Sequence, residues 1–194
     1  MRLFGPLYDR CLRGARHAHA VWYLGAISAI EAIFFPIPPD VMLAPMTLAR
    51  PARWFRYATI TTLASVGGGM IGYGLGYFAL DALMPWMARA GYLDTYQLAH
   101  DQFARYGVWI IFVAAFTPIP YKVFTVGAGA ADMAVFPFMF ASLLGRGARF
   151  FLVAGLVAWG GPRVEPHLRR YIEAVGWGVA VVILGAIIWL NIRR

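Results

Sequence analysis

Charged residues are scarce in this sequence of 194 residues. Asp, Glu, Lys and Arg make up 13% of the chain, about half the share found in soluble domains, whereas 61% of the residues are hydrophobic and the mean hydropathy is +0.64. A soluble fold of this size could not bury so much apolar surface. The composition predicts an integral membrane protein of one domain and excludes a cytosolic enzyme, a disordered tail and a disulfide-rich secreted module.

Cysteine and the residue patterns of enzymes are also scarce or absent. Cys11 is the only cysteine, which excludes an internal disulfide and a cysteine-based metal cluster. No Ser/His/Asp, Cys/His or H-E-x-x-H arrangement occurs, and the glycine-rich run at residues 67–72 follows no predicted strand. We therefore expect no enzyme activity, no metal and no cofactor, and interpret Gly68, Gly72 and Gly76 as a small-residue face for close helix packing.

Basic residues outnumber acidic ones by 17 to 9. In a soluble protein this excess would suggest nucleic acid, but in a membrane protein it favours anionic lipid head groups. We therefore expect membrane lipids as partners and no nucleic acid. Residues 1–19 intersperse arginine with Leu, Phe and Tyr, which is typical of an amphipathic helix at a membrane surface.

Several segments have the length and hydropathy of membrane elements. Three are long and apolar enough to span a bilayer as helices: residues 54–80, 134–160 and 170–192. Residues 81–105 mix charged with aromatic residues, so we expect a partly helical extramembrane loop there.

Two further apolar segments, residues 20–50 and 106–131, are interrupted near their middle by proline. The breaks consist of Pro36, Pro38 and Pro39 in the first and Pro118 and Pro120 in the second. Proline removes an amide donor and clashes with the preceding turn, so a helix ends at such a cluster. Broken backbone at membrane depth is tolerated only where protein or a water-filled cavity receives its polar groups. We interpret both segments as re-entrant helical hairpins.

The two broken segments also form an internal repeat. A shift of 82 residues aligns residues 34–41 with residues 116–123, with five identities in eight positions. Because a hairpin returns to its own side and a spanning helix crosses, consecutive repeats have opposite topology, as in many transporters. The expected fold is all-α and membrane-integral: an inverted repeat of two re-entrant hairpins, each followed by a spanning helix, with the amphipathic N-terminal helix and a C-terminal spanning helix added.

The distribution of arginine predicts the orientation. With the N-terminus on side A, that side holds ten arginines and the other side four, so side A is expected to be cytoplasmic. If residues 20–35 form a full span instead, the split becomes eight to six and the C-terminus lies inside.

Five ionisable residues fall within apolar segments. The repeat places Asp40 opposite Lys122, the only lysine, and both follow their prolines directly. Intramembrane charges usually face a cavity or one another, so these two form either a structural ion pair between the hairpins or part of a substrate or proton site.

The other three are an acid in the first hairpin and two arginines in the second spanning segment. Glu31 is either a proton carrier or a counter-ion for Arg146 or Arg149. The arginines lie about 12 residues, or roughly 18 Å, from either end of their apolar segment, which is too deep for snorkelling to water. They must meet a carboxylate, a carbonyl or an anionic ligand, and the planar guanidinium suits phosphate oxygens well.

At these residues the chain resembles the DedA family, the bacterial branch of the membrane proteins with a VTT domain. The likeness covers about residues 20–160. It rests on Glu31 followed by Phe-Pro-Ile-Pro-Pro-Asp at 35–40, on Phe-Thr-Pro-Ile-Pro-Tyr-Lys at 116–122, and on Gly-Arg-Gly-Ala-Arg-Phe at 145–150. The Pro-Ile-Pro-Tyr-Lys run is similar to the YqaA-type subgroup in particular.

The resemblance implies two facing re-entrant hairpins and lipid translocation, either of undecaprenyl phosphate or of phospholipids. It also implies that Glu31 and Asp40 stand for the family's essential acids and Lys122 for its basic residue. Many members carry two arginines in the second hairpin, and here the first position is Ala115 and the second is displaced to Lys122.

We therefore expect a multi-pass lipid transporter of the bacterial inner membrane, a flippase or scramblase for a phosphate-bearing lipid, with protons as a coupling ion through Glu31 or Asp40. A proton-coupled antiporter for a small ion or solute and a non-transporting membrane organiser are the alternatives. Five side chains are expected to converge in one polar pocket near the midplane: Glu31, Asp40, Lys122, Arg146 and Arg149.

Overall fold

The structure is a computed structural model that describes residues 19–34, 38–91, 93–117 and 120–161. These parts of the chain are helical and contain no strand. Apart from residue 19, the expected amphipathic helix of residues 1–19 and the expected spanning helix of residues 170–192 lie outside the described residues.

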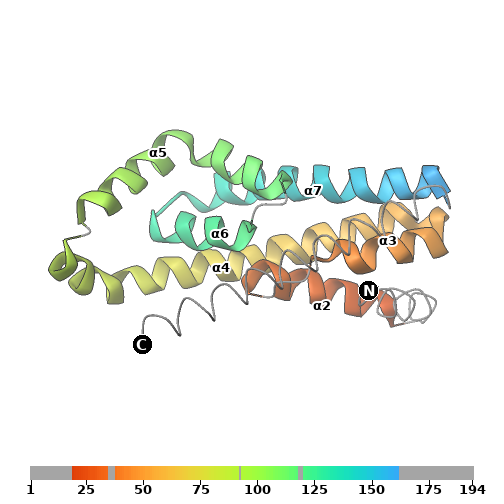
Figure 1. Cartoon of the computed structure of the whole chain (residues 1–194), viewed down its shortest axis with the longest axis horizontal. Coiled ribbons are helices and arrows are strands. Elements are labelled where there is room, and N and C mark those ends of the chain that lie inside the picture. Colours follow the sequence, from red (N-terminus) through yellow and green to blue (C-terminus); the bar gives the residue numbers. More distant parts are fainter. Residues whose placement is uncertain (1–18, 35–37, 92, 118–119, 162–194) are drawn as a thin grey trace, which may run out of the picture.

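The first half of the fold begins with two short helices that run in opposite directions. Helix α2 (Ala20–Ile33) runs from one end of the molecule to its middle, and α3 (Asp40–Ala49) returns to the same end (Figure 1). Pro39 occupies the N-cap of α3 with a φ of −64°, which suits a helix start. With 14 and 10 residues, the helices rise about 21 Å and 15 Å, so neither alone crosses a hydrocarbon core of about 30 Å.

A single long helix connects the two halves. A 3-10 turn, η1 (Pro51–Arg53), leads into α4 (Trp54–Ala90), whose 37 residues run the length of the molecule. Residues 81–105, for which the sequence predicts a partly helical extramembrane loop, are helical to Ala90 and again from Leu93, with a turn at Gly91, whose φ of 74° favours glycine. Their place outside the membrane stays a prediction. Charged residues appear from residue 81 onward, so the sequence is no longer uniformly apolar there. The helix nevertheless continues, because Ala, Leu, Met and Arg all favour helix.

The second half repeats the order of the first from the opposite end. Helix α5 (Leu93–Phe116) runs to the middle, α6 (Tyr121–Ala130) turns back, and α7 (Val135–Gly160) runs from there to the far end (Figure 1). Shifted by 82 residues, the end of α2 and the starts of α3 and α4 fall within one residue of the end of α5 and the starts of α6 and α7. The repeat seen in the sequence is therefore a repeat of helices.

Glycines in α4 bring the short helices against it. A Cβ on Gly68 would lie 2.2 Å from the carbonyl oxygen of Ala29 in α2, and one on Gly76 would lie 2.0 Å from that of Val126 in α6. A Cβ on Gly72 would meet the hydroxyl of Thr125 at 2.5 Å. The predicted small-residue face is confirmed, since only glycine permits these close approaches.

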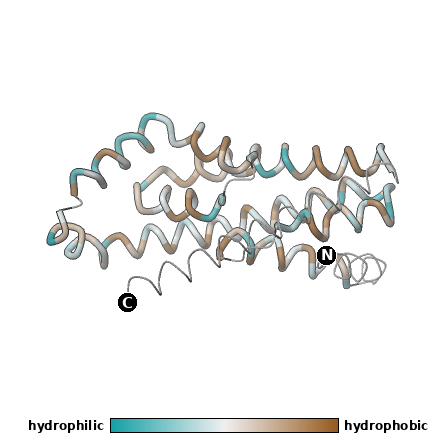
Figure 2. The backbone as a smooth tube through the Cα atoms, in the orientation of Figure 1, coloured by the Kyte–Doolittle hydropathy of each residue, from teal (hydrophilic) through white to brown (hydrophobic). Residues whose placement is uncertain are grey.

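The two longest apolar stretches expose much of their surface. Pro51–Ala82 and Val135–Gly160 are long and apolar enough to cross a membrane, yet only 39% and 44% of their most apolar windows is buried inside the structure. Phe78, Phe136 and Trp159 are at least 77% exposed. Figure 2 shows hydrophobic residues along α7, with hydrophilic residues near the middle of the molecule and at the outer part of α5. Such apolar surface suits contact with lipid.

Candidate functional site

The candidate site lies at the middle of the molecule, where the two helix breaks meet α7. Glu31 is in the last turn of α2, and Asp40 is the first residue of α3. Lys122 is the second residue of α6, just after the other break. Arg146 and Arg149 lie one turn apart near the centre of α7, so they project from one side of that helix.

Glu31 forms an ion pair with Arg146. Oε2 of Glu31 accepts a hydrogen bond from Nη2 of Arg146, and their side chains are 17% and 2% exposed. The pair joins residues 115 positions apart in the chain. Of the two arginines left open as counter-ions for Glu31, the structure selects Arg146.

Asp40 forms a second ion pair with Arg149. Nη2 of Arg149 lies 2.5 Å from Oδ2 of Asp40, and the side chains are 13% and 6% exposed respectively. The hypothesis of an Asp40–Lys122 pair overlooked this arginine. A position one turn beyond Arg146 suits Asp40 because α3 packs against α7, and guanidinium reaches farther from its backbone than ammonium does.

Two basic side chains donate hydrogen bonds to backbone carbonyl oxygens at the helix breaks. Lys122 Nζ donates to the carbonyl oxygen of Phe34, the C-cap of α2, at 3.1 Å. Arg149 Nη1 donates to the carbonyl oxygen of Thr117, just after α5, at 3.0 Å. Lys122, from the second repeat, thus binds the backbone at the first break, and Arg149 links the backbone at the second break to Asp40. Such donors are what broken backbone in an apolar setting requires.

Aromatic rings surround Arg146. Its Cζ lies 4.5 Å from the ring centre of Tyr121 and 5.3 Å from that of Phe150, within the range of cation–π contact. The hydroxyl of Tyr121 donates to Oγ of Ser142 at 2.7 Å. This role of Tyr121 was not among the predictions from the sequence, although its place beside Lys122 in the Pro-Ile-Pro-Tyr-Lys run was a signal for it.

Among the described residues, the five ionisable groups of the site carry more positive than negative charge, and two buried polar atoms lack a hydrogen-bond partner. In their ordinary charged forms, two carboxylates and three basic groups leave a net charge of +1 on these residues. Within the described parts of the chain, Oδ1 of Asp40 and Nε of Arg146 are buried without a hydrogen-bond partner. Leaving such atoms unpaired is costly, so the arrangement suits a ligand or a proton.

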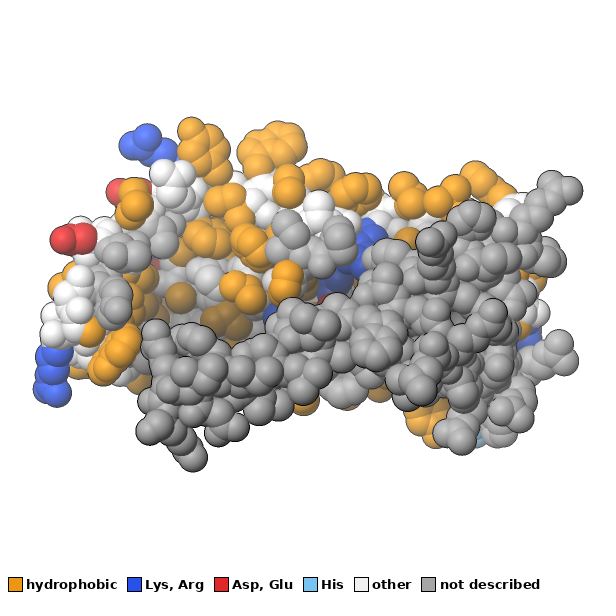
Figure 3. Space-filling model, in the orientation of Figure 1, with side chains coloured by type: hydrophobic (Ala, Val, Ile, Leu, Met, Phe, Trp, Pro, Cys, Tyr) orange, Lys and Arg blue, Asp and Glu red, His pale blue; other side chains and the backbone are white. Residues whose placement is uncertain are grey.

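The structure brings the five predicted residues to one region, as two ion pairs and a lysine bound to a carbonyl. Figure 3 shows basic and acidic side chains near the middle of the long axis, between apolar side chains. Pro38, Pro39 and Pro120 lie in the breaks, whereas Pro36 and Pro118 are outside the described residues. A role of the five residues in binding substrate or protons stays a prediction.

Together, the fold and the site define an α-helical membrane protein whose repeated halves meet at charged, proline-broken helix pairs. Comparison with known proteins agrees: the VTT domain matches residues 32–158, which cover both breaks and four of the five residues, and Glu31 directly precedes the matched range. The chain belongs to the VTT domain family, and the resemblance to its DedA branch is confirmed.

Close relatives exist in two bacteria. An uncharacterized protein of Haemophilus influenzae is 47% identical over 182 residues, which cover 94% of this chain and 95% of that protein. An uncharacterized protein of Histophilus somni is 44% identical over 193 residues, the full length of both chains. No solved structure matches the chain significantly.

Proposed function

We propose that this protein is a lipid transporter, a flippase or scramblase, that moves the phosphate head group of a lipid past the charge cluster at the helix breaks. The observation that carries this proposal is the net charge of +1 on five residues held among apolar helices. An anionic head group would neutralise that excess, whereas a cation would add to it. Undecaprenyl phosphate and phospholipids both supply such a group.

The ion pairs suggest how a phosphate could enter. Carboxylate and phosphate both accept two parallel hydrogen bonds from guanidinium, so a phosphate oxygen can replace Oδ2 of Asp40 at Arg149 or Oε2 of Glu31 at Arg146. Protonation of either carboxyl group would weaken its ion pair and free the arginine. This exchange would couple transport to protons.

The same geometry supports a proposed placement in the membrane. In this proposal α2–α3 and α5–α6 are re-entrant hairpins whose breaks meet near the midplane, and α4 and α7 span the bilayer. The protein would lie in the bacterial inner membrane with several passes and its N-terminus in the cytoplasm, because arginine is enriched on that side. The breaks would then supply the irregular backbone that transporters place at their binding sites.

The test is reconstitution of the purified protein into liposomes that contain fluorescent lipids with phosphate-bearing or neutral head groups. We expect flipping of the phosphate-bearing lipids, and loss of most of it in Arg149→Gln. Arg89→Gln is the matched control, because it removes an arginine from the last turn of α4, far along the chain from the site. Proton flux without flipping would favour the antiporter, and neither activity would favour the membrane organiser. Either result would contradict the proposal.

A further inference from the structure

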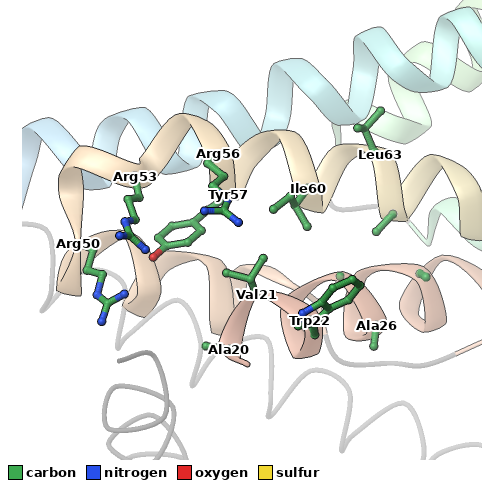
Figure 4. A pocket seen from close by; sticks show the side chains of 13 residues that line it. Ala20, Val21, Trp22, Ala26, Arg50, Arg53, Arg56, Tyr57, Ile60 and Leu63 are labelled. Carbon is green, nitrogen blue, oxygen red and sulfur yellow. The ribbon is translucent and has the colours of Figure 1, made fainter. Parts of the chain in front are cut away.

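A groove with a basic end lies between α2 and α4 in the first half of the protein. It encloses about 980 Å³. Apolar side chains line most of its length, among them Val21 and Trp22 from α2 and Ile60 and Leu63 from α4. At one end Figure 4 shows three arginine side chains together beside the ring of Tyr57: Arg50, Arg53 and Arg56.

Among the described residues that line the groove, every charged side chain is an arginine and none is acidic. Arg53 and Arg56 are exposed, so their guanidinium groups are accessible from the surface. Arginine side chains at one end of an apolar groove suit an anionic amphiphile, because they can bind its charged head group while the apolar walls contact its hydrocarbon chain.

The length of the groove matches one leaflet. From Arg53 to Ala64 the chain advances 11 residues, which corresponds to about 17 Å, close to half of a hydrocarbon core of about 30 Å. At its inner end the lining includes Ala29, two residues before Glu31. The groove therefore leads from one surface of the protein toward the charge cluster.

The internal repeat supplies a comparison groove. A second groove of about 580 Å³ lies beside α5 and the start of α7, and the shift of 82 residues relates its Phe103 and Gly107 to Val21 and Gly25 of the first. The same shift places Asp132 where the first groove has Arg50. The charges of the second groove are mixed, since His100 and Arg105 also line it. The three-arginine end therefore belongs to one half alone.

We propose that the groove between α2 and α4 binds a phospholipid, with its phosphate at the three arginines and an acyl chain along the apolar walls. The inference rests on the proposed function, because it makes this groove the loading site on one leaflet. The charge supports this occupant, since a lipid phosphate neutralises the positive charge that Arg53 and Arg56 present at the surface.

Binding to the purified full-length protein in a neutral detergent tests this inference. The probes are dioleoylphosphatidylglycerol, dioleoylphosphatidylcholine and inorganic phosphate, each titrated and measured by native mass spectrometry. The main variant is Arg53→Gln with Arg56→Gln. The matched control is Arg89→Gln with Arg105→Gln, which removes the same charge outside this groove. Ala26→Trp fills the groove without changing its charge.

We expect tighter binding of the anionic lipid than of the zwitterionic one, and no competition by inorganic phosphate. An exposed arginine–phosphate ion pair contributes up to roughly a fivefold factor, so the double variant should weaken binding by up to about 25-fold. The control pair should change binding by less than about twofold, and Ala26→Trp should reduce it. Equal binding by the double variant and its control would overturn the proposal, and so would unaltered binding by Ala26→Trp, which would mean that another segment fills the groove.

The liposome assay separates failure of this inference from failure of the proposed function. If phosphate-bearing lipids are flipped but the groove variants bind lipid normally, the loading site is wrong and the transporter stands. If no lipid is flipped while the groove binds phosphatidylglycerol as described, the groove is a lipid site and the transport function is wrong.

Discussion

Removing either member of the Asp40–Arg149 pair should destabilise the protein, and removing both should cost less than the sum. The Asp40 side chain is 6% exposed with Arg149 in place; in Arg149→Gln neither of its oxygens would be paired among the described residues, and the carbonyl of Thr117 would lose its donor. Breaking a buried pair from one side costs about 3–5 kcal/mol in the free energy of unfolding. Asp40→Asn should cost less, because Arg149 keeps the Thr117 carbonyl.

The double variant Asp40→Asn with Arg149→Gln leaves neither charge uncompensated. We expect its loss of unfolding free energy to fall short of the sum of the single losses by about 1–3 kcal/mol. Arg149→Lys should lie between wild type and Arg149→Gln, because it keeps the charge but loses the planar fork that reaches both Asp40 and Thr117.

The measurement is equilibrium unfolding in mixed micelles with rising dodecyl sulfate, followed by tryptophan fluorescence. Arg89→Gln is the control for loss of an arginine and should change the free energy by less than about 0.5 kcal/mol. Single losses that add within about 0.5 kcal/mol would refute the coupling. A double variant that is stable but does not flip lipid would separate a transport role of the pair from a structural one.

Three further variants test the packing and the polar contacts. Gly76→Ala should lower the unfolding free energy by more than about 2 kcal/mol, because its Cβ would overlap a backbone carbonyl, while Gly74→Ala, with no neighbouring atom within 4 Å, should change it little. Tyr121→Phe removes the hydrogen bond to Ser142 and should cost about 1 kcal/mol in the same assay. Lys122→Gln should lose most lipid flipping, roughly 10-fold or more, whereas Lys122→Arg should keep part of it; equal losses would indicate that shape matters instead of charge.

The repeat in the sequence predicted the order of helices well because proline and glycine act locally. Pro39 and Pro120 directly precede helix starts, and Gly68 and Gly76 fall at the close contacts that their spacing indicated. These residues restrict the backbone through their own covalent structure, so their effect needs no knowledge of distant segments.

The partners in the site were harder to predict because they depend on three-dimensional distance. Equivalence in a repeat placed Asp40 opposite Lys122, but equivalent positions meet only near the axis that relates the two halves. Arg149 has no charged counterpart in the first repeat, where the shift leads to Gly67. The sequence likewise left open how much of the loop predicted at residues 81–105 is helical, since hydropathy reports where charged residues begin and helix propensity reports where a helix ends.

The long separation between ion-pair partners affects how the protein is made. Glu31 and Asp40 precede Arg146 and Arg149 by 115 and 109 residues. At a synthesis rate of about 5–20 residues per second, both acids emerge roughly 5–20 s before the arginines exist. During that interval they would reach the bilayer protonated or wait beside the insertion machinery. Chains truncated before Arg146 should therefore be degraded in cells faster than the full-length protein, and equal lifetimes in a pulse-chase experiment would show that the acids need no partner during insertion.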